Sequence, residues 1–127
     1  MQCLTDSLNM PEINALSQLV ALFHDIGRFR QYARYGTFAD RLSVNHAREG
    51  ILVLKQEGIL TQLTSLQARI ILTAIAQHNR IHIRTRSEPH RLFCKLIRDA
   101  DKLDIYLLVL DYYERNEKEK RNYRMEL

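Results

Sequence analysis

The chain has 127 residues, enough for one domain with a buried core and too few for two. Apolar residues make up 46% of it, with only 4 Gly and 2 Pro, a composition that favours long helices over a turn-rich β fold. The net charge of +4 would suit an anionic partner, but much of the excess lies in the last dozen residues. Because a charged helix end is usually just solvated, nucleic-acid binding is not favoured.

The cysteines and the apolar runs indicate the cellular compartment of the protein. Cys3 and Cys94 show neither the paired spacing of a zinc knuckle nor that of a disulfide framework, and Cys94 lies in an apolar stretch typical of a buried helix. The N-terminus lacks the basic segment of a signal peptide, and the longest apolar runs are too short to cross a bilayer. We therefore expect a cytoplasmic protein with no membrane partner.

Two helical segments are predicted in the first third of the chain. Pro11 fits the first position of a helix whose apolar residues recur at helical spacing from Ile13 to Phe23, and Gly27 ends the pattern. This helix therefore ends at the pair His24-Asp25. Residues 28–41 are aromatic and basic, which predicts a short helix followed by a loop.

Three further helices follow. Ser43 is a plausible N-cap for a helix that stops at Gly58, and Thr64 with Gln67 resembles a capping box that opens the next one. After an irregular segment, Pro89 begins a long helix with an apolar stripe from Leu92 to Leu110, and the sequence turns polar after Tyr113. We predict an all-α fold, a compact bundle of about five helices, in a single domain spanning 1–127 with a polar tail from about residue 115.

Histidines and carboxylates recur on the faces that these helices turn toward one another. On a helical wheel His24 and His46 flank apolar stripes, His78 lies within one, and Asp101 occupies the shoulder of the last helix. A lone histidine on an apolar face is more often a hydrogen-bonded core residue, and an Asp there is usually part of a surface ion pair. The combination is different, because imidazoles and carboxylates from several helices can surround one cation. We therefore predict a metal site in the bundle.

Four ordered motifs give the chain a family resemblance. They are HDIGRF at 24–29, NHAREG at 45–50, QHN at 77–79 and IRDADKLD at 97–104. Together they resemble the HD-domain superfamily of metal-dependent phosphohydrolases. The resemblance implies a helical HD-type fold and hydrolysis of a phosphomonoester or phosphodiester at a divalent metal. The implied metal ligands are His24, Asp25, His46, His78 and Asp101, and the implied catalytic residues are His24, Asp25, Asp101 and Arg28.

The metal and the substrate stay open at this stage. Mixed imidazole and carboxylate ligands suit Mn, Fe, Co, Ni or Zn and, less well, Mg. The expected partner is a small phosphorylated substrate, with a nucleotide as one candidate. Aromatic residues between Tyr32 and Phe38 and the arginines at 80, 84, 86 and 91 would suit a base and its phosphates, or they simply pack and are solvated.

The chain departs from the resemblance at one ligand. Superfamily members carry a first histidine on a preceding helix, and this sequence has none before His24. Either the chain starts late or it is a degraded member, and its C-terminus would be shortened too. An open coordination position predicts weaker metal affinity than in complete relatives. The competing hypothesis is a catalytically impaired module for signalling or oligomerisation, and a homo-oligomer is possible in either case.

Overall fold

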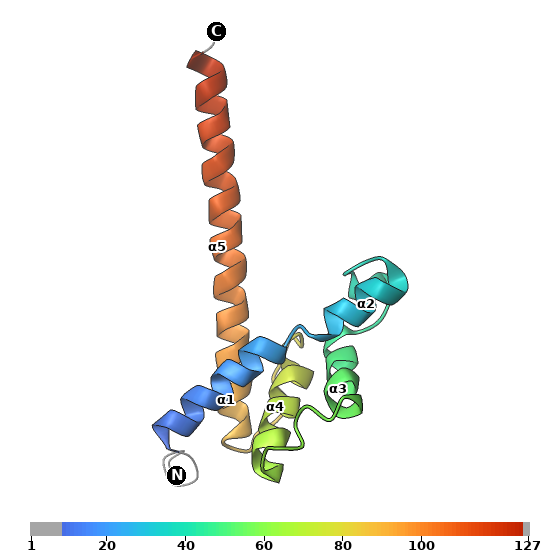
Figure 1. Cartoon of the computed structure of the whole chain (residues 1–127). Coiled ribbons are helices and arrows are strands. Elements are labelled where there is room, and N and C mark those ends of the chain that lie inside the picture. The colour runs from blue at the N-terminus through green and yellow to red at the C-terminus, as the bar shows by residue number, and fades with distance from the viewer. Residues whose placement is uncertain (1–8, 126–127) are drawn as a thin grey trace.

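The computed structural model describes the backbone of residues 9–125 and the side chains of residues 9–121. The described residues form helices and no strand, which confirms the all-α prediction (Figure 1). The helices, in chain order, are α1 (Met10–Phe23), α2 (Gly27–Tyr35), the short 3-10 helix η2 (Asp40–Leu42), α3 (His46–Gln56), α4 (Ser65–Gln77) and α5 (His90–Met125).

Local capping explains where these helices begin. The capping box at Thr64 and Gln67 is present at the start of α4, as predicted. The predicted N-cap of α3 is wrong by two residues, because Asn45 and not Ser43 accepts the hydrogen bonds from the first backbone amides of the helix. The hydroxyl of Ser43 instead donates to the carbonyl of Ala39, within the turn around η2.

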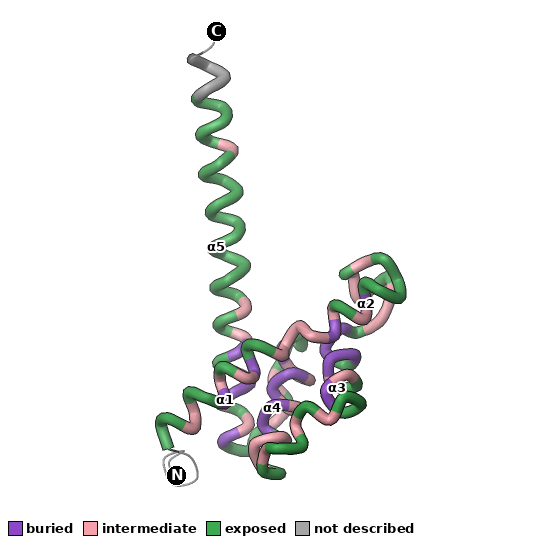
Figure 2. The backbone as a smooth tube through the Cα atoms, in the orientation of Figure 1, coloured by how far each residue is buried: buried purple, intermediate pink, exposed green. Residues whose placement is uncertain are grey.

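The core is built around α4. Its buried residues Ile70, Ile71, Ala74 and Ile75 pack against α1, α3 and α5, and the tube of this helix has purple stretches in Figure 2. The other buried members of the core are Leu16 and Val20 of α1, Leu54 of α3, and Phe93, Cys94 and Ile97 of α5. Cys94 is fully buried, as its apolar surroundings in the sequence predicted.

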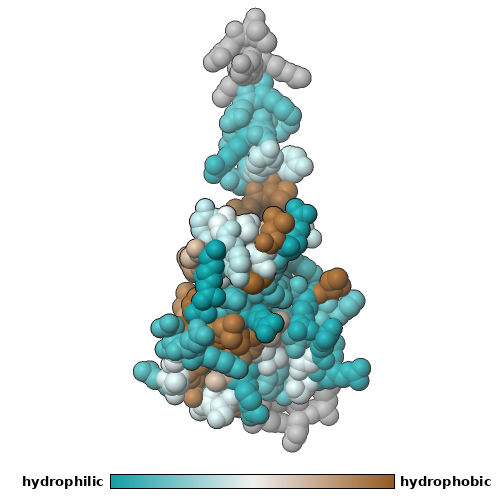
Figure 3. All heavy atoms as spheres, turned by 90° about the vertical axis from the view of Figure 1, so that its right-hand side faces the viewer, coloured by the Kyte–Doolittle hydropathy of each residue, from teal (hydrophilic) through white to brown (hydrophobic). Residues whose placement is uncertain are grey.

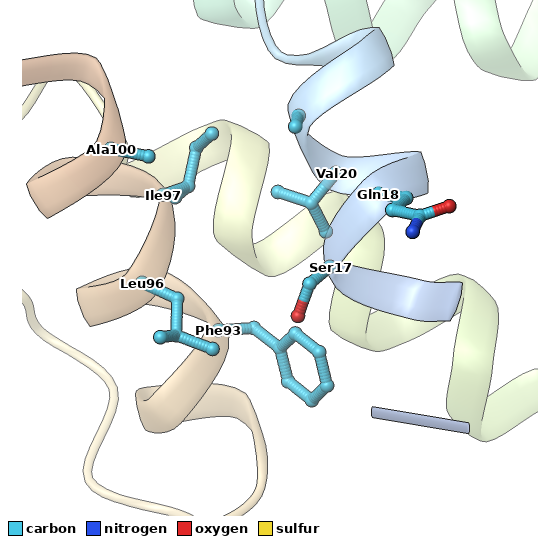
Figure 4. A pocket seen from close by; sticks show the side chains of 8 residues that line it. Ser17, Gln18, Val20, Phe93, Leu96, Ile97 and Ala100 are labelled. Atoms are coloured by element: carbon cyan, nitrogen blue, oxygen red, sulfur yellow. The ribbon is translucent and has the colours of Figure 1, made fainter. Parts of the chain in front are cut away.

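The packing between α1 and α5 leaves an apolar cavity of about 300 Å³. Figure 4 shows Val20 and Ser17 of α1 on one side of it and Phe93, Leu96 and Ile97 of α5 on the other. The cavity has an almost entirely apolar wall.

The prediction of a compact bundle is wrong for α5. Its first turns pack against α1 and α4, and together with α1, α2, α3 and α4 they form what we call the body. The rest of α5 extends away from the body (Figures 1 and 2). Leu103, Leu107 and Leu110, which the sequence placed on a core-facing stripe, are 58–65% exposed. The reason is that helical periodicity reports an apolar face without reporting whether another element covers it.

Candidate metal centre

The predicted ligands lie where helix ends meet. His24 caps the C-terminus of α1, Asp25 lies in the turn between α1 and α2, and His78 caps the C-terminus of α4. His46 is the first residue of α3, and Asp101 projects from α5. Five side chains from four separate parts of the sequence are therefore presented to one region of the body.

The carboxylate of Asp25 stands at the centre of this region. Its Oδ1 lies 3.3 Å from Nε2 of His46 and 3.5 Å from Nε2 of His78, and its Oδ2 lies 3.6 Å from Nε2 of His24. Asp101 joins from the other side, with its Oδ1 3.6 Å from Nε2 of His24. All five residues of the predicted ligand set are thus brought together. Among the described residues, Asp25, His46 and His78 have ligand atoms close enough to hold one ion jointly.

The hydrogen bonds of the three imidazoles fix which nitrogen faces the centre. Nδ1 of His24 lies 2.7 Å from the carbonyl oxygen of Ala21, and Nδ1 of His78 lies 2.7 Å from that of Ile75. Carbonyl oxygens only accept, so both Nδ1 atoms donate a proton, and in the neutral imidazole this leaves Nε2 with a lone pair. Nδ1 of His46 likewise donates to Asp40, at 2.8 Å.

These lone pairs point at each other. The Nε2 atoms of His46 and His78 are 3.0 Å apart, which calls for either a proton shared between them or a cation beside them, because two unprotonated nitrogens this close would repel. Hydrogen-bonded Nδ1 with free Nε2 is the arrangement that metal-binding histidines adopt. The donor set therefore fits a divalent cation held by mixed nitrogen and oxygen ligands.

Protons compete for the same position. Contacts with the imidazoles of His46 and His78 hold the pKa of Asp25 far below its usual range, so this residue is a carboxylate at any ordinary pH. Burial lowers the pKa of His46, but the carboxylates of Asp25 and Asp40 outweigh burial, and the pKa of His46 ends above its usual value. Without a metal, His46 thus tends to carry the proton that balances Asp25.

Asp40 is the residue that the sequence analysis missed. It lies in η2 and accepts from Nδ1 of His46, from the backbone amide of His46 and from the side-chain amide of the fully buried Gln31. Burial raises the pKa of Asp40, but the hydrogen bonds from Gln31 and His46 outweigh it, and the pKa is lowered overall. No periodic signal marks an acidic residue in an irregular segment, so nothing in the sequence pointed to it.

Arg28, predicted as catalytic, is held beside the cluster. Its Nε lies 3.3 Å from Oδ1 of Asp25, and its Nη1 donates to the carbonyl of Phe38 at 3.0 Å. Both contacts use the guanidinium to fix Asp25 and the loop that carries Asp40. The geometry therefore indicates that Arg28 positions a ligand.

A close contact between helices sets the spacing of the cluster. A Cβ on Gly27 would lie 2.0 Å from the carbonyl oxygen of His46 and 2.4 Å from the amide nitrogen of Gly50. Only glycine allows the start of α2 to lie directly against α3 in this way. Asp25, two residues earlier, is thereby held within reach of His46.

A cavity of about 190 Å³ opens beside His78 and Asp101. Arg80, Arg98 and Lys102 contribute positive charge to its wall, and Arg98 is anchored by a hydrogen bond to the carbonyl of Ile81. The predicted aromatic segment does not take part. Tyr32 and Phe38 stack on one another, with ring centroids 4.7 Å apart, and neither lines this cavity.

Comparisons with known proteins complete the description of the site. Within the described part of the chain, no helix is long and apolar enough to cross a membrane. Comparisons with curated proteins and with solved structures found no match. The model of the family described as HD domain matches residues 2–106, most of the chain and all four motifs around the cluster. The converging histidines and aspartates and this match lead to one conclusion, that the chain belongs to the HD domain family.

Proposed function

We propose that this protein is a divalent-metal-dependent phosphohydrolase acting on a small phosphate ester. HD domains bind divalent metals and are generally hydrolases, which supports the reaction class. The observation that carries the proposal for this chain is the convergence of three Nε2 atoms on the carboxylate of Asp25, each with its Nδ1 proton already engaged.

Each residue of the cluster has a definite task in this proposal. His24, Asp25, His46, His78 and Asp101 would hold the cation. The chemistry that a bound divalent cation supplies is Lewis acidity, which activates water near neutral pH and draws charge from the phosphoryl oxygens. Mn, Fe, Co, Ni and Zn suit this donor set, and Mg suits it less well.

The neighbouring residues orient ligands and substrate. Asp40 keeps His46 in the tautomer that turns Nε2 toward the centre, and Arg28 fixes the carboxylate of Asp25. Arg80, Arg98 and Lys102 surround the adjacent cavity, where their charge would attract a phosphate group to within reach of the cation. A cavity of this size suits a phosphoryl group and a small leaving group, with the rest of a nucleotide outside it.

The test uses the purified full chain, stripped with a chelator and reloaded with Mn²⁺, Co²⁺, Ni²⁺ or Zn²⁺. Metal content is measured by elemental analysis, and hydrolysis is measured on p-nitrophenyl phosphate, bis-p-nitrophenyl phosphate and nucleoside monophosphates. We expect at least one metal to bind and to restore hydrolysis. His46→Ala is expected to lower both the bound metal and the rate by about 100-fold or more.

A matched histidine provides the control. His82 lies exposed on the segment before α5, so His82→Ala should retain the metal and the rate. A chain that binds none of these metals and hydrolyses none of these esters would contradict the proposal. That result would favour the alternative of a catalytically impaired HD-fold module for signalling or oligomerisation.

A further inference from the structure

The part of α5 beyond the body exposes an unusual amount of apolar surface. Nine large apolar side chains there are 45–65% exposed, whereas exposed apolar side chains on a monomer are usually scattered singly. In Figure 3 brown surface lies on this helix between the body and its hydrophilic last turns. The nine are Leu103, Ile105, Tyr106, Leu107, Leu108, Val109, Leu110, Tyr112 and Tyr113.

One face of this helix combines apolar and charged residues in a regular order. Phe93 and Ile97 turn toward the body, and at 100° per residue the opposite face carries apolar residues in its middle and charges at both ends. Apart from the adjacent Val109 and Leu110, these residues follow the spacing of three and four that is typical of helix pairs. In order they are Asp99, Lys102, Tyr106, Val109, Leu110, Tyr113, Glu117 and Lys120.

We propose that this face binds the same face of a second copy of the chain, with the two α5 helices antiparallel. In this alignment Val109 faces Leu110 of the second copy, and Tyr106 faces its Tyr113. The charges then pair as well, because Lys102 meets Glu117 and Asp99 meets Lys120. The two-fold symmetry repeats every contact, which is the self-complementarity that a symmetric dimer requires.

Charge selects this arrangement over the parallel one. A parallel pair would bring each of the four charged residues against its own copy, which places like charges opposite one another. Among the ion pairs of the described residues, none involves Asp99, Lys102, Glu117 or Lys120, so these groups are free to pair across the interface.

The bodies do not obstruct this pairing. The buried residues Phe93, Cys94 and Ile97 lie on the face of α5 opposite to the proposed interface, so most of each body lies on the outside of the helix pair. The antiparallel direction also places them at opposite ends of it. The interface shares only Lys102 with the proposed function, because that residue also lines the cavity beside His78 and Asp101, and it uses none of the proposed metal ligands.

The first test is association of the full chain, measured by sedimentation equilibrium. We expect a dimer at micromolar concentration. Lys120→Asp places a carboxylate opposite Asp99 of the second copy, and the two-fold symmetry repeats this repulsion. The variant should therefore raise the dissociation constant about tenfold or more. The double variant Asp99→Lys with Lys120→Asp should restore it. Lys118→Glu, a charge reversal that points away from the interface, should change it little. A monomer, or a dimer indifferent to Lys120→Asp, would overturn the proposal.

The second test is the direction of the helices. Lys120→Cys is spin-labelled in a Cys3→Ser background, where the remaining Cys94 is fully buried. At 1.5 Å per residue the antiparallel pair separates the two labels by about 30 Å along the helix axis, whereas a parallel pair brings them to about 10 Å. A short distance in the pulsed EPR spectrum would exclude the proposed pairing even if the protein is dimeric.

Discussion

At the scale of single residues, the imidazole of His46 is held at both of its ring nitrogens. It lies between two carboxylates, with Asp40 at Nδ1 and Asp25 near Nε2. Asp40 thereby decides which nitrogen is free, although it does not touch the position where a cation would lie. Such outer carboxylates raise the basicity of the imidazole and fix its orientation.

Asp40→Asn should therefore weaken metal binding about 10-fold to 100-fold, because the amide can still accept a hydrogen bond but brings no charge. The affinity is measured by isothermal titration calorimetry with the metal that binds best to the unmodified chain. Asp104→Asn, at an exposed position on α5, serves as the control and should leave the affinity unchanged. An unchanged affinity for Asp40→Asn would mean that this carboxylate does not orient His46.

The raised pKa of His46 also predicts how metal binding depends on pH. A cation must displace the proton on His46, so the apparent affinity should fall from about pH 8 to about pH 6, beginning above the ordinary histidine value of 6.5. Asp40→Asn removes one cause of the raised pKa and should move this fall to lower pH. Calorimetry at several pH values, corrected for buffer protonation, measures both effects.

The metal-free protein should show the opposite trend in its stability. A histidine whose folded pKa exceeds its unfolded pKa stabilises the fold at low pH, and this contribution is lost as the pH rises past 6.5 through the folded value. Chemical denaturation of the stripped chain should therefore give a lower free energy of unfolding at about pH 8 than at about pH 6. A flat profile would contradict the raised pKa.

At the scale of helices, the contact between α2 and α3 leaves no room for a side chain at Gly27. Gly27→Ala would place a methyl group inside the backbone of α3, so we expect a loss of stability of about 3 kcal/mol or more, with loss of metal binding. The matched variant is Gly36→Ala, where φ is +66° but no atom lies within 4 Å of the new Cβ. That change should cost about 1 kcal/mol and leave metal binding intact.

The N-caps of α3 and α4 can be compared in the same way, because one lies at the cluster and the other lies far from it. Asn45 caps α3, and its side-chain oxygen also accepts from Asn79, which joins the helix ends that carry His46 and His78. Asn45→Ala should cost about 1 kcal/mol and weaken metal binding. Thr64→Ala removes a cap of similar strength at the far end of α4, about 20 Å away, so it should lower stability alone. Equal effects of both variants on metal affinity would show that the junction of Asn45 and Asn79 does not matter.

At the scale of the whole molecule, the body and the long helix differ in how they are stabilised. The core around α4 is internal to one chain, whereas the apolar residues of α5 beyond residue 102 have no cover in the described part of it. If a second copy pairs with this helix, hydrogen exchange in residues 103–120 should slow as protein concentration rises. Exchange in α4 should not depend on concentration. Fast exchange in α5 at every concentration would leave that helix without a partner.

The sequence determined by itself the features that depend on local order. Apolar spacing predicted the helices, the pair of Thr64 and Gln67 predicted a capping box, and the four motifs predicted which five residues lie together. These predictions succeeded because helical periodicity and capping act within a few residues. The four motifs added the resemblance to a family, which implied which residues lie together.

Only the tertiary structure decided the features that depend on packing between distant segments. It placed Asp40 behind His46, engaged Arg28 with Asp25, and left Leu103, Leu107 and Leu110 in the open. Wheel positions are the same whether or not a neighbour is present, and an irregular loop has no period from which to place an aspartate. Which side chain meets which, and which surface stays uncovered, is set by contacts between segments far apart in the chain.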